Sequence, residues 1–154
     1  MTLYNMPKLL EKINSDLKAA MIAKDAFSLS ALRMLIAAAR NKEITLRKDG
    51  AAELSDEQVI EVVASEIKKR KDSAEAYIAG GRQELADKEN AEVELLKKYL
   101  PEQMSDVELE KVVEEVIAGG DENFGKVMGQ VMARVKGKAD GGKVGEMVKK
   151  LLAK

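Results

Sequence analysis

The residues best suited to chemistry in this chain are basic residues and glycines between positions 123 and 143. Glycines stand at positions 137, 141 and 142, next to several lysines. A glycine at a helix start leaves backbone N–H groups open to an anion, and lysine adds positive charge. The pattern therefore favours binding of an anion such as phosphate, although the same glycines would equally serve a tight turn without a ligand. The basic candidates are Lys126, Arg134, Lys136, Lys138 and Lys143.

Residues 137–143 also match the start of a nucleotide-binding P-loop, which is a glycine, four residues and then Gly-Lys. The next residue of that motif is Ser or Thr, which holds magnesium, but here it is Val144. The motif should follow a buried strand, whereas the segment before it here has the apolar spacing of a helix. We therefore exclude an ATPase.

The composition removes several kinds of catalysis. The chain contains no His and no Cys, which excludes imidazole bases, Ser-His and Cys-His pairs, thiolate zinc sites and disulfides. Its many carboxylates fall on helix faces that we expect to be exposed, where they aid solubility and i,i+4 pairing. We predict no catalytic residue, no metal site and no cofactor.

The first residues lack the contiguous apolar core of a signal peptide, and no segment approaches the roughly 18 apolar residues of a membrane span. The expectation from these features is a cytoplasmic protein without a membrane partner.

Two short amphipathic helices must position the basic residues. Their apolar side chains recur at helical spacing on one face of each segment, which leaves the bases for the opposite face and the turn. The first stripe is Phe124, Val127, Met128, Val131, Met132 and Val135. The second stripe is Val144, Met147, Val148, Leu151 and Leu152.

Charge is distributed unevenly over this part of the chain. Residues 101–122 carry eight acidic residues and one lysine, a net charge of −7, and residues 123–154 carry eight basic and two acidic residues, a net charge of +6. Such polarity is typical of a basic binding face. It is also typical of acidic and basic helices that complement each other in one bundle, and the sequence leaves both interpretations open.

The whole chain is predicted to be all-α. Aromatic residues make up only 3% of it, there are two prolines, and no run of alternating apolar and polar residues indicates a strand. Capping boxes at Ser55–Gln58 and Ser105–Glu108 begin two helices, and Gly80-Gly81 ends the first of these. The predicted boundary is Pro101, with a four-helix domain over 1–100 and a small three-helix bundle over 101–154.

A second basic run, 68–71, lies inside the third predicted helix. A short run of bases is more often a solvated helix face than a nucleic-acid contact. Arg70 and Lys71 are the exceptions, since Arg70 lies three residues from Ile67 and close to the apolar stripe.

Five ordered motifs resemble the bacterial YqeY family over almost the whole chain. They are KRKDS at 69–73, AGGRQEL at 79–85, YLPEQMS at 99–105, GKVM at 125–128 and KGKADG at 136–141. One departure is Gly81, an additional glycine before Arg82 that lengthens the turn there.

The YqeY family is similar to the C-terminal helical tail of GatB, the B subunit of the tRNA-dependent amidotransferase. The resemblance implies a helical N-terminal domain and a small helical C-terminal domain. It also implies a link to tRNA, because that tail is thought to hold the tRNA body. The family is often described as having carbon–nitrogen ligase activity with glutamine as amido donor, a description that we regard as inherited from the larger enzyme.

The sequence and this resemblance together predict a tRNA-binding or amidotransferase-associated helical module without independent catalysis. The partners would be tRNA and amidotransferase subunits or other translation proteins, and Arg70, Lys71 and Arg82 would extend the basic surface. The alternatives are the carbon–nitrogen ligase itself and a protein-interaction adaptor. A helix-turn-helix DNA binder fits less well, because the turn at 136–142 is longer than that motif prefers.

Overall fold

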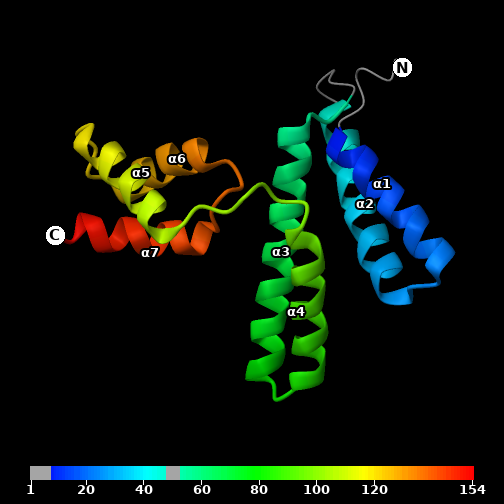
Figure 1. The fold of residues 1–154 in the computed structure, drawn as a ribbon. Helices are drawn as coiled ribbons and strands as arrows, with labels where there is room; N and C mark the ends of the chain where they lie inside the picture. The colour runs from blue at the N-terminus through cyan, green and yellow to red at the C-terminus, as the bar shows by residue number, and fades with distance from the viewer. Residues whose placement is uncertain (1–7, 48–52) are drawn as a thin grey trace. The chain divides into compact units, whose positions relative to one another are not determined.

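The computed structural model describes residues 8–47 and 53–154, and each regular element in these ranges is an α-helix, as predicted (Figure 1). The helices are α1 (Lys8–Ala23), α2 (Ala26–Arg47), α3 (Asp56–Ala79), α4 (Gln83–Lys97), α5 (Asp106–Ala118), α6 (Phe124–Val135) and α7 (Gly141–Leu152). The chain divides into two compact units, of which the first ends at Tyr99 and the second begins at Leu100. Among the described helices, none combines the length and apolar character that crossing a bilayer requires.

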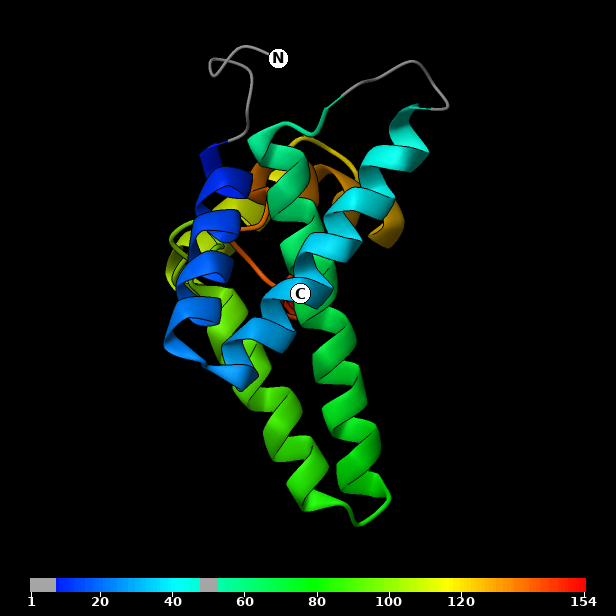
Figure 2. The ribbon, with the colours of Figure 1, turned by 90° about the vertical axis from the view of Figure 1, so that its right-hand side faces the viewer.

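The first unit is built on two helical hairpins. Helix α1 packs on α2, and α3 packs along α4, while α2 also contacts α3 and α4 and α1 contacts α3. The α3–α4 hairpin is the longer one, and its turn extends past the end of the α1–α2 hairpin (Figure 2). The interior is aliphatic, with Ile13, Leu32, Leu35, Val63 and Leu96 almost fully buried.

The ends of α3 follow from the residues found there. The Ser55 hydroxyl accepts a hydrogen bond from the Gln58 N–H, and the Gln58 side chain accepts one from the Ser55 N–H, so the predicted capping box is formed. At the other end, Gly81 adopts a φ of 75°, a left-handed conformation that costs glycine little. This glycine therefore makes the tight turn from α3 into α4.

Tyr99 fixes the end of the first unit. Its ring is buried, and its hydroxyl donates a 2.6 Å hydrogen bond to the Asp16 carboxylate of α1. The Lys98 ammonium lies 3.8 Å from the same carboxylate and 5.1 Å from the centroid of the Tyr99 ring. These contacts hold the chain that leaves α4 against α1.

The second unit has a small core made almost entirely of valine. Its buried side chains come from α5, α6 and α7, which all pack on one another. They are Leu109, Val113, Val116, Val127, Val131, Val135, Val144 and Val148. Two members of the predicted α6 stripe lie at the edge of this core instead of inside it, since Phe124 is 43% exposed and Met132 is 36% exposed.

Candidate nucleic-acid interface

The turn between α6 and α7 carries the central residues of the predicted basic surface. Lys136 is the C-cap of α6 and has a left-handed backbone with a φ of 36°, and Gly137 follows with a φ of 82°. The Lys138 N–H then donates to the Val135 carbonyl at 2.8 Å. Successive left-handed residues thus reverse the chain and leave the Lys136 and Lys138 side chains exposed.

The segment that enters the second unit holds this turn in place. The Met104 N–H donates a 2.8 Å hydrogen bond to the Lys138 carbonyl. The Gln103 amide donates to the carbonyls of Gly137 and Pro101, both at 2.9 Å. The turn is therefore anchored by hydrogen bonds from residues more than thirty positions away, and its lysines extend from a fixed backbone.

The start of α7 does not offer the open anion site that its glycines suggested. Asp140 is the N-cap, and its carboxylate accepts a 2.9 Å hydrogen bond from the Gly142 N–H. A carboxylate of the chain thus already occupies the position that a bound anion would take. The glycines serve the turn and the cap, and any phosphate contact would fall to the lysine side chains.

Two of the five predicted basic residues pair with the acidic helix α5. Arg134 contacts Glu115 at 2.6 Å, and Lys143 contacts Asp106 at 3.1 Å. This is the complementation of acidic and basic helices that the charge distribution left open. All four side chains are between 47% and 74% exposed, so solvent screens both pairs and each contributes little to stability.

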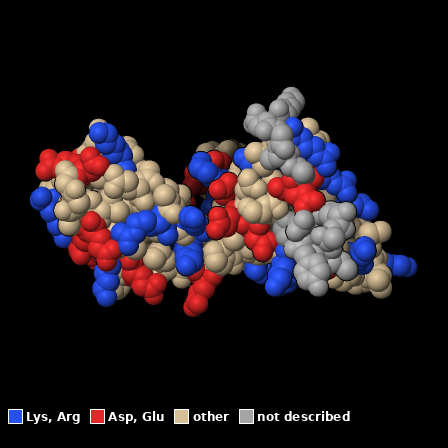
Figure 3. All heavy atoms as spheres, turned by 90° about the horizontal axis from the view of Figure 1, so that it is seen from above, with Lys and Arg blue, Asp and Glu red and all other residues tan. Residues whose placement is uncertain are grey.

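The remaining predicted basic residues of the second unit are all exposed but differ in their contacts. Lys126 and Lys138 are exposed, and neither side chain has an ion pair or hydrogen bond to another described residue. Lys136 is exposed as well but does interact with the chain. Over the second unit in Figure 3 (left), basic and acidic side chains are interspersed.

Sequence reasoning left out Lys149 and Lys150. Both are exposed in the last turn of α7. Their position opposite the second apolar stripe was a signal that could have identified them.

The structure removes Arg70 from the predicted basic surface. Its side chain is only 4% exposed and lies inside the first unit. It donates to the Glu92 carboxylate of α4 at 3.0 Å and, within α3, to the Glu66 carboxylate at 3.1 Å and the Glu66 carbonyl at 3.0 Å. The Glu66 and Glu92 side chains are themselves only 11% and 7% exposed. Arg70 is therefore a structural residue that joins α3 to α4, and it does not face a ligand.

The other two candidates of the first unit are less buried than Arg70. Lys71 is half-buried and interacts with the chain. Arg82 is exposed at the start of α4, where its backbone N–H donates to the Tyr77 carbonyl at 2.8 Å.

The titratable groups with clearly shifted pKa values have structural explanations. Burial raises the pKa of Tyr99, and the hydrogen bond to Asp16 and the charge of that carboxylate raise it further. Hydrogen bonds from Ser28 lower the pKa of Asp25 at the start of α2. In the described residues, His, Cys, Asp and Glu form no group of three or more that could hold a metal ion. None of these features indicates a catalytic centre.

Comparison with known proteins places the chain in a family. The family model described as Yqey-like protein matches residues 10–152. The curated relatives carry the name "Altered inheritance of mitochondria protein 41, mitochondrial". The protein of Saccharomyces cerevisiae is 39% identical over 88 residues, which cover 57% of this chain and 46% of the relative. That of Candida glabrata is 31% identical over 101 residues, which cover 66% of this chain and 53% of the relative.

This chain thus spans about half the length of the curated relatives that it matches. Their names contradict the expectation of a cytoplasmic protein, because these relatives are mitochondrial proteins. The predicted family is confirmed, since its model covers nearly the entire chain. The chain belongs to the YqeY-like family.

Proposed function

We propose that this chain is a tRNA-binding helical module without independent catalysis, and that it contacts phosphates through the lysines around the α6–α7 turn. The observation that carries the proposal is the exposure of Lys136 and Lys138 on a turn held by Gln103 and Met104. Lys126, in the first turn of α6, is exposed as well. The choice of tRNA as the nucleic acid rests on the resemblance of the family to the tRNA-holding tail of an amidotransferase subunit.

Recognition in this proposal is by backbone and shape. Structured RNA hides its base edges in a deep and narrow groove, and aromatic side chains for stacking make up only 3% of the chain. Contacts from lysine to phosphate release counterions, so the affinity should fall steeply as salt increases. Arg134 and Lys143 can join these contacts, because exposed ion pairs are weak enough for phosphate to replace the α5 carboxylates.

The test is a set of charge variants of the full chain, titrated into bulk tRNA at several salt concentrations. The first variant combines Lys136→Gly, Lys138→Ala and Lys143→Ala. Glycine is used at position 136 because the backbone there is left-handed, so alanine would add strain. We expect weaker binding and a salt dependence whose slope is lower by about one for each phosphate that the variant no longer binds.

The matched control removes the same charge elsewhere, with Lys12→Ala, Lys88→Ala and Lys111→Ala. All three lysines are exposed and make no ion pair with a described residue. The proposal predicts that this control binds tRNA almost as the unmodified chain does. Equal losses in both variants would mean generic electrostatic attraction, and unchanged binding by a folded turn variant would refute the assignment to the turn.

Further measurements on the same protein distinguish two other functions. Glutamine- and ATP-dependent amide transfer to charged tRNA by the purified chain would establish the carbon–nitrogen ligase and overturn the non-catalytic part of the proposal. No tRNA binding at low salt would overturn the proposal as a whole and favour a protein-interaction adaptor.

A further inference from the structure

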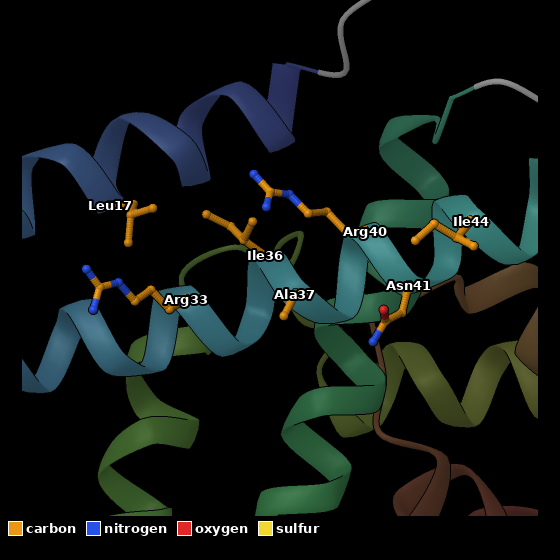
Figure 4. A pocket seen from close by; sticks show the side chains of 7 residues that line it. All are labelled: Leu17, Arg33, Ile36, Ala37, Arg40, Asn41 and Ile44. Atoms are coloured by element: carbon orange, nitrogen blue, oxygen red, sulfur yellow. The ribbon is translucent and has the colours of Figure 1, made fainter.

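A groove between α1 and α2 in the first unit is not used by the proposed tRNA contacts. It encloses about 350 Å³. Figure 4 shows Leu17 reaching from α1 toward α2, and Ile36 reaching from α2 toward α1. Ala37 and Ile44 also line the groove, and Ile44 is 54% exposed. The surface of the groove is thus mainly apolar.

Two arginines of α2 flank this apolar surface. Arg33 and Arg40 line the groove, and Figure 4 shows both side chains on the side of α2 that faces α1, with Ile36 between them. Both residues are exposed, and neither guanidinium has an ion pair or a side-chain hydrogen bond to another described residue. Arg70, in contrast, is buried and bonded to two carboxylates. These two cations are available to a ligand.

The spacing of the arginines matches the geometry of a helix. They are seven residues apart on α2, which corresponds to about 10 Å along the helix axis. Carboxylates seven residues apart on a second helix, aligned along the groove, would have the same separation. Apolar side chains three and four residues beyond the first carboxylate would then face Ile36 and Ala37, which is the usual arrangement of anchors in helix-in-groove recognition.

We propose that this groove docks an acidic amphipathic helix of a partner protein. The partner supplies two carboxylates at i and i+7 to Arg33 and Arg40, and it buries apolar side chains between them. A phosphate backbone would satisfy the guanidinium groups but would leave Ile44 and the apolar lining in water. The combination of exposed cations with an apolar surface therefore favours a helix with both kinds of side chain over a nucleic acid.

The test uses the full chain and a fluorescent alanine-based helical peptide of about 15 residues. The peptide carries glutamates at i and i+7 with leucines at i+3 and i+4, and a control peptide carries glutamine in place of both glutamates. The protein variants are Arg33→Glu with Arg40→Glu, and a matched control with Lys42→Glu and Arg47→Glu, which changes the same charge on α2 outside the groove. Binding is followed by fluorescence anisotropy, and folding by thermal melts.

We expect saturable binding of the glutamate peptide and a loss of affinity of about tenfold or more in the groove variant, because two favourable charge pairs become repulsive. A peptide with lysines in place of the glutamates should bind the groove variant better than it binds the unmodified chain. The control variant should bind the glutamate peptide nearly as well as the unmodified chain does.

Equal binding of the glutamate and glutamine peptides would overturn the proposal, as would unchanged binding by the groove variant. A dimer in sedimentation that dissociates in the groove variant would assign the groove to a second copy of this chain and would also overturn it. The groove variant should bind tRNA normally. If the groove variant lost tRNA binding but bound the peptide unchanged, the arginines would contact nucleic acid. If it bound both tRNA and the peptide unchanged, the docking proposal would be refuted and the proposed tRNA function would stand.

Discussion

Arg70 of the first unit and the predicted basic residues of the second unit occupy opposite environments. In the first unit, Arg70 is inside, between the carboxylates of Glu66 and Glu92. In the second unit, the five basic residues of the predicted surface are all exposed, and two of them pair with α5 in solvent. Both groups lie within or next to an apolar stripe in the sequence. The difference shows that proximity to a stripe does not decide whether a cation supports the fold or is available to a ligand.

The cores of the two units differ in the same way. Among the described residues, the buried charged side chains are Glu66, Arg70 and Glu92, and all three belong to the first unit. The second unit is held by a purely apolar cluster of valines and Leu109. The first unit should therefore be sensitive to loss of one charge, and the second to loss of apolar volume.

The largest expected effect is that of Arg70→Ala. This change leaves two buried carboxylates without their cation, and we expect it to lower the free energy of unfolding by about 3–5 kcal/mol. Urea denaturation followed by circular dichroism measures the loss. In the matched control, Glu66→Leu, Arg70→Met and Glu92→Leu together replace all the charges, and stability should return close to that of the unmodified chain. A cost below about 1 kcal/mol for Arg70→Ala would contradict a structural role.

Leu109→Ala tests the apolar core of the second unit. Leu109 is 2% exposed, and truncating a buried leucine costs about 2–5 kcal/mol through lost burial and the cavity that remains. We expect thermal or urea unfolding of the second unit at milder conditions, with loss of tRNA binding as the turn loses its support. Val107→Ala on the same helix is the control, because Val107 is 64% exposed and should be almost neutral. Equal effects of the two changes would contradict the assigned core.

Only part of this fold could be predicted from the sequence. The all-α class and the ends of α3 follow from local signals, namely helical periodicity, the Ser55 capping box and the glycines before Arg82. The role of Arg70 depends on Glu92, which is 22 residues away on another helix. Hydrophobic periodicity identifies the inner face of each helix but does not identify which charges meet across helices.

The same limit applies to the candidate interface. Lys143 pairs with Asp106, which is 37 residues away, and Arg134 pairs with Glu115, which is 19 residues away. The sequence indicated that acidic and basic helices were present but not how they pair. Phe124 and Met132 have the spacing of core residues, yet they lie at the margin of a core that the smaller valines fill. In the sequence, the α1–α2 groove is marked only by two arginines seven residues apart, which is not a recognisable motif.

Tyr99→Phe should have an intermediate effect. It removes the hydrogen bond to the Asp16 carboxylate, which we expect to contribute about 1.5 kcal/mol because Asp16 is partly exposed. The pKa of Tyr99 is raised in the folded chain, so folding favours its protonated form. This contribution is complete below about pH 10, the ordinary pKa of tyrosine, and is lost as the pH rises toward the folded-state pKa.

The pH dependence supplies the check on this interpretation. Urea denaturation of the unmodified chain and of Tyr99→Phe at several pH values should give a stability difference that is constant near neutrality and shrinks above about pH 10. A difference that grows with alkaline pH would contradict the proposed hydrogen bond.

The smallest effect is expected for the exposed pairs of the second unit. Arg134→Ala or Glu115→Ala should change the free energy of unfolding by less than about 1 kcal/mol, since both partners are largely in solvent. The two changes should nevertheless differ in tRNA affinity. Arg134→Ala removes a cation and should weaken binding, whereas Glu115→Ala frees that cation and should leave binding equal or stronger. Parallel changes in both variants would mean that the pair is structural, as in the first unit.

Direct binding of tRNA tests the proposed function most simply. The unmodified full chain is titrated into bulk tRNA and into a DNA duplex of matched length over a range of salt concentrations. We predict preference for tRNA and an affinity that falls steeply with salt, because the proposed contacts join exposed lysines of the second unit to phosphates of a folded RNA. Equal weak binding to both nucleic acids, or no binding at low salt, would contradict the proposed function.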